Sequence, residues 1–178
     1  MSIWDMANRT KTYIAGDWDG DKDAINQLHT WNNSKYWGLK FVDVHEFTSS
    51  HDSSLNCNIK KSLRQRMSIS KTFILIVGEH TKNLRSGACY ECSSYNSCTK
   101  SCARGYSVDN RSYVDYECYL ASSTFHGIKI VVLYNSTKVD RDLCPDAVRY
   151  LGKHVAMKHV TFLTSDWDYK AVKDAIDS

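Results

Sequence analysis

The apolar residues of the chain fall into short runs that predict five β-strands. The runs KTYIAG (11–16) and LKFVDVHEF (39–47) have the composition typical of strands. The runs KTFILIVG (71–78) and GIKIVVLYN (127–135) are continuously apolar, as expected for strands covered on both faces. HVTFLT (159–164) predicts the fifth strand.

Apolar residues at helical spacing separate these runs. They predict helices within four segments: 17–37, 53–68, 113–126 and 165–178. Ser165 is the predicted N-cap of the last helix, and Asp168 completes a capping box. In the second helix, basic residues such as Lys60 lie off the apolar stripe and are expected on its outer side. Strands that alternate with helices predict an α/β fold, a three-layer sandwich with a five-stranded parallel sheet and helices on both faces.

Length and composition are those of one globular domain. The 178 residues, 42% of them apolar and 24% charged, predict a single domain over 1–178. A net charge of only +3 does not favour nucleic-acid binding. We expect no membrane span, because no apolar run approaches the roughly 20 residues that a bilayer requires. The start MSIWDMANRT has no basic stretch followed by an apolar one, so we expect a cytoplasmic protein.

Parallel sheets carry their functional sites at the carboxyl ends of the strands, so the loops there supply candidate residues. In the first loop, GDWDGD (16–21), Asp17 could hold ribose hydroxyls or a metal, or serve helix capping. Asp19 and Asp21 favour capping, and Trp18 suits base stacking or a protein contact.

Two histidines end predicted strands. His45 and His80 lie at the ends of the second and third strands, which makes them the two histidines worth testing. The ordinary interpretation of either is a solvated or hydrogen-bonded side chain.

One carboxylate, Glu117, lies in the predicted helix that leads into the fourth strand. Val114, Cys118, Ala121 and Phe125 form an apolar stripe on that helix, and Glu117 is about 60° from its centre. This position predicts a side chain at the border between core and solvent, partly desolvated and able to reach a ligand. The structural alternative is a boundary glutamate whose head stays in water.

Three segments together resemble a known family. FILIVGEHTKN ends the third strand, YVDYE begins the helix of Glu117, and GIKIVVLYN follows. Their order and their spacing to the strands resemble the Toll/interleukin-1 receptor (TIR) domain family, and more narrowly the TIR-like ThsB proteins of the Thoeris antiphage defence system. The family motif has tryptophan where this chain has Tyr113, whereas Val114, Tyr116 and Glu117 match it.

The resemblance implies a flavodoxin-like fold and NAD as a substrate, with Glu117 as the catalytic residue. Cleavage of the nicotinamide–ribose bond would yield an ADP-ribose-derived signal that activates an effector protein. Tyr113 or Trp18 could stack on a ring of the dinucleotide. The main alternative is a non-catalytic TIR-like protein-interaction module. A flavin or nucleotide binder is a third, which the acidic first loop disfavours.

Four cysteines crowd into CYECSSYNSCTKSC, within a polar segment, 79–112, that is predicted to be an insertion before the helix of the fourth strand. Two closely spaced pairs could supply the four thiolates of a structural zinc site. The residues are Cys89, Cys92, Cys98 and Cys102. Disulfides and free thiols remain alternatives.

The segment 79–112 precedes the helix of Glu117, so we expect it to overhang the site. It could be a lid, an arm that recognises a partner, or a contact within a homo-oligomer. The other three cysteines, Cys57, Cys118 and Cys144, are expected to be ordinary core or surface residues.

Overall fold

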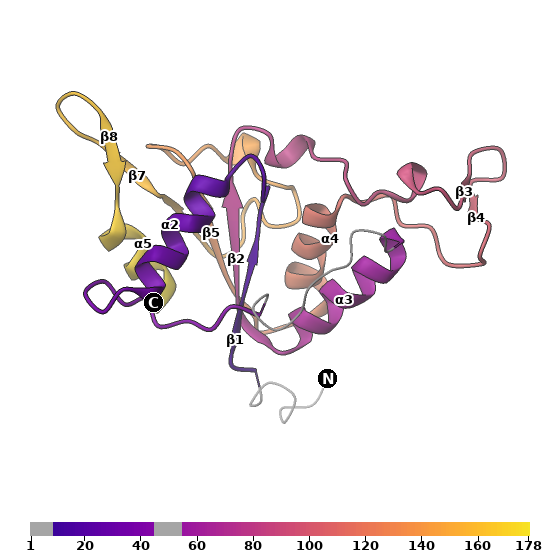
Figure 1. Ribbon diagram of the computed structural model, residues 1–178, viewed down its shortest axis with the longest axis horizontal. Coiled ribbons are helices and arrows are strands. Elements are labelled where there is room, and N and C mark those ends of the chain that lie inside the picture. The colour runs from indigo at the N-terminus through magenta and orange to yellow at the C-terminus, as the bar shows by residue number, and fades with distance from the viewer. Residues whose placement is uncertain (1–8, 45–54) are drawn as a thin grey trace.

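A parallel sheet of four strands forms the centre of the molecule (Figure 1). The computed structural model describes residues 9–44 and 55–178. In spatial order the strands are β1 (Lys11–Ala15), β2 (Ser70–Val77), β5 (Lys129–Tyr134) and β6 (Lys153–Ala156), each parallel to its neighbour. The carboxyl ends of all four strands therefore lie along one edge of the sheet.

The strands bury side chains on both faces because successive residues point to opposite sides. Tyr13 and Phe73 contribute to the apolar cluster on one face, and Ile14 and Ile74 to the cluster on the other. Every residue of β2 except Lys71 is buried. The prediction that this continuously apolar strand is covered on both faces is confirmed.

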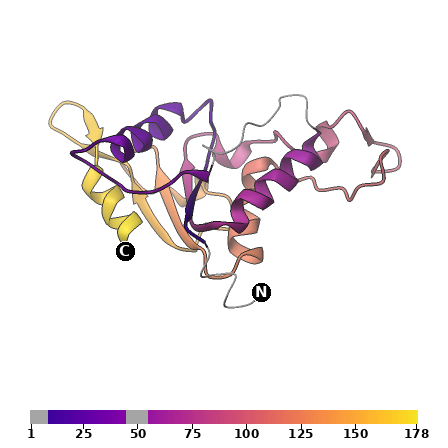
Figure 2. The same ribbon diagram turned by 60° about the horizontal axis from the view of Figure 1, so that its bottom comes forward.

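Helices cover both faces (Figure 2). Helices α3 (Asn56–Ser68) and α4 (Tyr113–Tyr119) contribute to the cluster that contains Tyr13. Helices α2 (Lys22–Asn33) and α5 (Tyr169–Asp177) contribute to the cluster on the opposite face. The predicted three-layer α/β arrangement is confirmed. No helix of the described residues is both long and apolar enough to traverse a bilayer.

The five-stranded sheet is not confirmed. Of the predicted second strand, the described part forms one parallel bridge, between Thr12 and Asp43. Because Thr12 also pairs with Thr72 of β2, this bridge lies on the outer edge of β1. Residues 45–47 of that prediction lie outside the described residues.

The predicted fifth strand, 159–164, is wrong. Thr161 and Thr164 close a turn within that run, and the run folds into an antiparallel hairpin of β7 (Lys158–Val160) and β8 (Ser165–Trp167). The fourth strand of the sheet is instead the shorter β6. Ser165 consequently lies in β8, and the N-cap of α5 is Asp168, whose side chain accepts from the backbone of Ala171 at 2.9 Å.

The cysteine-rich segment between β2 and α4 extends away from the sheet (Figure 1). It contains two single turns, η2 (Thr81–Asn83) and η3 (Cys89–Glu91), and a two-residue hairpin of β3 (Tyr95–Asn96) and β4 (Ser101–Cys102). After β5 comes one further turn, η5 (Arg141–Leu143).

Lys60 of α3 forms hydrogen bonds with the end of this segment, just before α4. Its ammonium group donates to the backbone oxygens of Asp109 and Arg111 at 2.9 and 2.7 Å. Lys60 is therefore buried, and its predicted place on the outer side of the helix is wrong.

Candidate active site around Glu117

Helix α4 carries Glu117, and both of its ends are well defined. Ser112 is the N-cap, and its hydroxyl oxygen accepts from the backbone N–H of Asp115 at 3.1 Å. The backbone N–H of Tyr113 donates to the carbonyl of Ser86 at 2.8 Å. A π-helical turn, η4 (Leu120–Thr124), continues the helix. The first two contacts fix the start of α4 to the segment that precedes it.

The Glu117 side chain points into the apolar layer between the sheet and α3. Only 6% of the residue is exposed. The hydroxyl of Tyr13, on β1, donates a hydrogen bond of 2.6 Å to Glu117 Oε1. Among the described residues, Glu117 Oε2 has no hydrogen-bond partner. The carboxylate therefore has one oxygen held by Tyr13 and one that accepts no hydrogen bond from the described residues.

Burial dominates the electrostatics of Glu117. Desolvation raises its pKa from 4.5, whereas the hydrogen bond from Tyr13 and the charge of Arg66 lower it, and the result is a pKa of about 7. Burial and the neighbouring Glu117 likewise raise the pKa of Tyr13 well above its ordinary value. Tyr13 is therefore a permanent donor at neutral pH, and Glu117 exchanges its proton there.

The predicted border position of Glu117 is wrong. The apolar stripe of α4 is buried as predicted, with Val114, Cys118, Ala121 and Phe125 in the core. Helix α4, however, contacts α3 as well as the sheet. The spacing of residues along α4 alone placed Glu117 between core and solvent, but α3 covers that side of the helix.

The first loop forms a polar cluster of its own at the carboxyl ends of β1, β2 and β5. Asp21 is buried, and its carboxylate accepts from Asn135 Nδ2 at 3.0 Å and from Thr81 Oγ1 at 3.4 Å. A Cβ on Gly78 would lie 2.0 Å from Asp21 Oδ1, so a larger residue at the end of β2 would displace the Asp21 carboxylate. Burial raises the pKa of Asp21.

Asp21 is thus a bridge between strand ends rather than a capping side chain. It occupies the N-cap position of α2, but it makes no capping hydrogen bond. Asp17 is half-buried and its Oδ1 accepts from the backbone N–H of Asp19, while Trp18 is exposed. Within the described residues, no hydrogen bond or ion pair joins this loop to Glu117.

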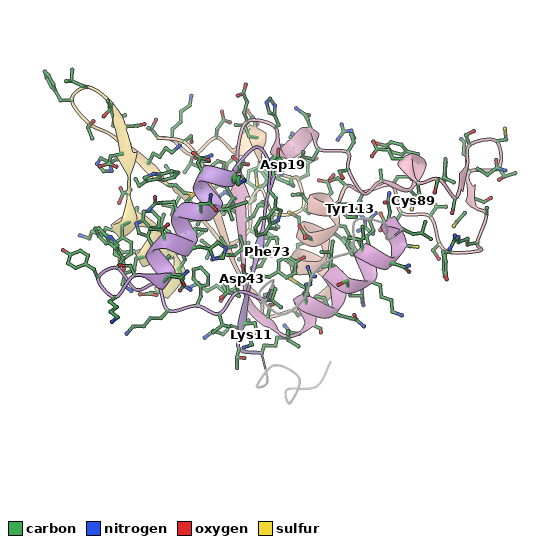
Figure 3. The ribbon with its side chains drawn as sticks, in the orientation of Figure 1. Lys11, Asp19, Asp43, Phe73, Cys89 and Tyr113 are labelled. Carbon is green, nitrogen blue, oxygen red and sulfur yellow. The ribbon has the colours of Figure 1, made fainter. Side chains whose placement is uncertain are left out.

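Of the remaining predicted substrate-binding residues, neither Tyr113 nor His80 forms a hydrogen bond or ion pair with Glu117 among the described residues, although Tyr113 lies one turn before it on α4. Tyr113 donates to Asn56 Oδ1 at 3.0 Å, and thiols of the cysteine-rich segment add to burial in raising its pKa. In Figure 3, Tyr113 lies on the side of the molecule that carries Cys89, and Asp19 lies on the other side of it. His80 is exposed at the end of β2. His45 lies outside the described residues.

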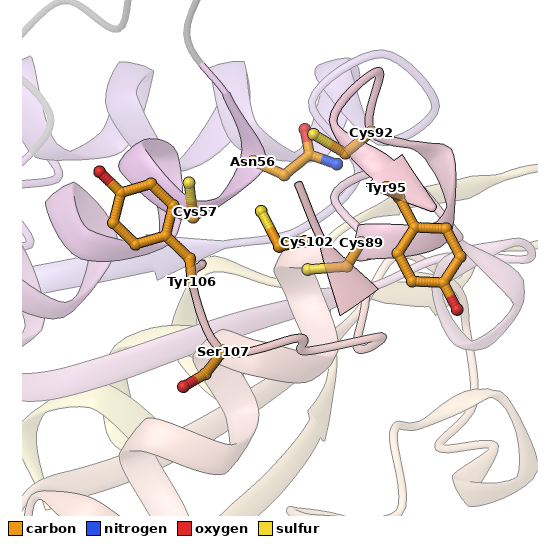
Figure 4. A pocket seen from close by; sticks show the side chains of 8 residues that line it. All are labelled: Asn56, Cys57, Cys89, Cys92, Tyr95, Cys102, Tyr106 and Ser107. Atoms are coloured by element: carbon orange, nitrogen blue, oxygen red, sulfur yellow. The ribbon is translucent and has the colours of Figure 1, made fainter. Parts of the chain in front are cut away.

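Four cysteines line one hollow between α3 and the cysteine-rich segment, and three of them belong to the predicted zinc set. Cys57, on α3, joins Cys89, Cys92 and Cys102 around it, whereas Cys98 is exposed elsewhere (Figure 4). Among the described residues, no group of three or more histidines, cysteines or acids is placed to hold a metal ion. Zinc at Cys89, Cys92, Cys98 and Cys102 stays a prediction, which metal analysis of protein purified without chelator would test.

Sequence reasoning missed Tyr13. The signal was a tyrosine within a short predicted strand, directly before the apolar residues Ile14 and Ala15. A buried tyrosine hydroxyl requires a hydrogen-bond partner, so its position predicted a polar group in the core. That the partner is Glu117 could not be read locally, because the two residues are 104 positions apart.

Comparison with known proteins bears on the first part of the chain. Residues 13–86 match the family model described as Thoeris protein ThsB, TIR-like domain. The resemblance inferred from the sequence is thereby confirmed over β1, α2, α3 and β2, and the match ends before the helix of Glu117. No curated protein matches the chain.

Proposed function

We propose that this protein cleaves the bond between nicotinamide and ribose in NAD, with Glu117 as its catalytic residue. The proposal extends the match to the TIR-like ThsB family from residues 13–86 to the helix that follows. The observation that carries it is a buried carboxylate with one oxygen held by Tyr13 and the other without a hydrogen bond from the described residues.

The chemistry requires little more than a placed negative charge. When the bond from the ribose C1′ to the ring nitrogen breaks, both electrons leave with nicotinamide, which departs as a neutral molecule. Positive charge then develops on the sugar, and a nearby carboxylate stabilises it in a site from which water is excluded. Water, or a nucleophile within the remaining ADP-ribose, forms the new bond at C1′ and releases a proton.

The burial of Glu117 places two conditions on this reaction. With a pKa of about 7, the side chain is ionised in only part of the molecules at neutral pH. The positive nicotinamide ring of NAD would favour the ionised form as it approaches. Because so little of the residue is exposed, substrate binding must also uncover Glu117 Oε2.

Release of nicotinamide from NAD tests the proposal directly. The purified chain should release it, and Glu117→Gln, which keeps the size of the side chain, should lower the rate at least a hundredfold. Glu91→Gln is the matched control, because it makes the same chemical change on an exposed side chain of the cysteine-rich segment. Equal rates for a folded Glu117→Gln variant and the wild type would contradict the assignment.

The biological role follows as part of the same proposal. An ADP-ribose-derived product, cyclic or conjugated, would act as the signal of a Thoeris defence system and would activate an effector protein. Mass spectrometry of small molecules from phage-infected cells that express the chain would identify the product. A homo-oligomer, if one forms, would be detected by sedimentation of the active protein.

A second candidate function is a non-catalytic TIR-like interaction module. The observation that favours it is the tip of the β7–β8 hairpin, where Phe162 and Leu163 are 99% and 85% exposed. Apolar side chains this exposed are typical of surfaces that contact a partner. A protein with this function alone would release no nicotinamide in infected cells, and Glu117→Gln would retain the defence phenotype.

A further inference from the structure

Tyr13 is enclosed by the sheet and the apolar cluster packed on it. It lies on β1, which pairs with β2 along its whole length, and none of its surface is exposed. Its ring contacts that of Phe73, with centroids 6.0 Å apart. A ring held in this way keeps its hydroxyl at one point in space, and that point is 2.6 Å from Glu117 Oε1.

We propose that Tyr13 is the positioning residue of Glu117: its hydroxyl holds one carboxylate oxygen so that the other faces the sugar of the substrate. This inference rests on the proposed NAD cleavage. Helix α4 alone would leave the carboxylate free to rotate about the side-chain bonds, whereas a donor on the sheet selects one orientation. The strand thus supplies the rigid half of the site, and the helix supplies the charge.

The same hydrogen bond adjusts the proton affinity of Glu117. The groups that face the carboxylate are Tyr13 from β1 and Arg66 from α3, and both favour the ionised form. Asp43, beyond β1, acts on Tyr13 in the opposite sense to Arg66. Among the described residues, removal of the Tyr13 hydroxyl leaves Arg66 alone to offset burial, so Glu117 should hold its proton to a higher pH.

The test compares Tyr13→Phe with Tyr134→Phe. Both remove a hydroxyl from a tyrosine that is almost fully buried on a strand of the same sheet, but the hydroxyl of Tyr134 bonds His154 Nδ1 at 2.8 Å. In Tyr13→Phe the midpoint of the pH profile for nicotinamide release should rise by about one pH unit, the equivalent of one lost hydrogen bond to a charged group. In Tyr134→Phe the midpoint should not move.

An infrared titration of the Glu117 carboxyl group provides a measurement that does not depend on activity. The signal is assigned by its loss in Glu117→Gln, and its midpoint should also rise by about one pH unit in Tyr13→Phe. Unchanged midpoints in a folded Tyr13→Phe protein, with only its thermal stability lowered, would overturn the inference. If the wild type cleaves no NAD, the proposed function fails, and the infrared midpoint alone still decides whether Tyr13 controls Glu117.

Discussion

At the scale of single residues, Glu117 is an acid inside an apolar layer, and this has a thermodynamic consequence. A carboxyl group whose pKa is about 7 in the folded protein and near 4.5 when exposed binds its proton more tightly in the folded state. Its contribution to stability is fully present below pH 4.5 and is lost as the pH rises through 7. The whole difference corresponds to about 3 kcal/mol at alkaline pH.

Comparison of Glu117→Gln with the wild type should reveal the pH-dependent contribution of Glu117 to the free energy of unfolding. Glutamine does not ionise, so the variant should gain stability relative to the wild type as the pH rises, by about 2 kcal/mol between pH 5 and pH 8. Urea unfolding of both proteins at the two pH values measures the free energies of unfolding. A difference between the proteins that is independent of pH would show that Glu117 is not buried in solution.

At the scale of elements, the elements with strong, long patterns were predictable, and the short or interrupted ones were not. The continuous apolar runs of β2 and β5 and the stripe of α4 identified these elements. Strand β6 has four residues, none of them fully buried, and therefore carries no pattern. The run 159–164 has a strand-like composition, but a turn between Thr161 and Thr164 divides it.

The start of β6 depends on a glycine, which a pair of variants can test. Gly152 has φ +74°, and a Cβ there would lie 2.1 Å from the carbonyl oxygen of Ile130 on β5. Gly105 has a similar φ, +76°, with nothing within 4 Å of a Cβ. Gly105→Ala should cost about 1 kcal/mol for the backbone conformation alone.

In Gly152→Ala the backbone of β6 must also move away from β5. The free energy of unfolding should therefore fall by about 2 kcal/mol more than in Gly105→Ala. Chemical denaturation of the two variants beside the wild type provides the comparison. Equal losses would mean that β6 does not approach β5 as closely as described.

At the scale of the whole molecule, a body built on the sheet carries a cysteine-rich segment that extends from it (Figure 1). The exposure of the cysteines differs between these two parts of the molecule. Cys98 is exposed in the segment, whereas Cys118 and Cys144 are buried in the core. Burial also raises the pKa of Cys144 to about 11 and that of Cys118 well above its ordinary value.

Thiol labelling should follow the same division. At pH 8, Cys98 should react with an alkylating reagent first, and Cys118 and Cys144 should react only when the whole protein unfolds, because a buried thiol is neither accessible nor ionised. Mass spectrometry of peptides after timed labelling, with and without urea, measures the order. Early labelling of Cys118 in native buffer would contradict the packing of α4 on the sheet. Labelling of Cys98 that depends on chelator would support the zinc prediction.

The sequence by itself determined the α/β class, the strands at the centre of the sheet, the buried stripe of α4 and the resemblance to the TIR-like ThsB family. These properties follow from the spacing of neighbouring residues, because that spacing decides which side of a helix or strand is apolar. Only the tertiary structure decided that Glu117 is buried, that Tyr13 is its partner, and that Cys57 of α3 lines one hollow with Cys89, Cys92 and Cys102. Each of these depends on which distant segment of the chain packs against the residue. The pattern of residues along one helix or strand contains no information about that packing partner.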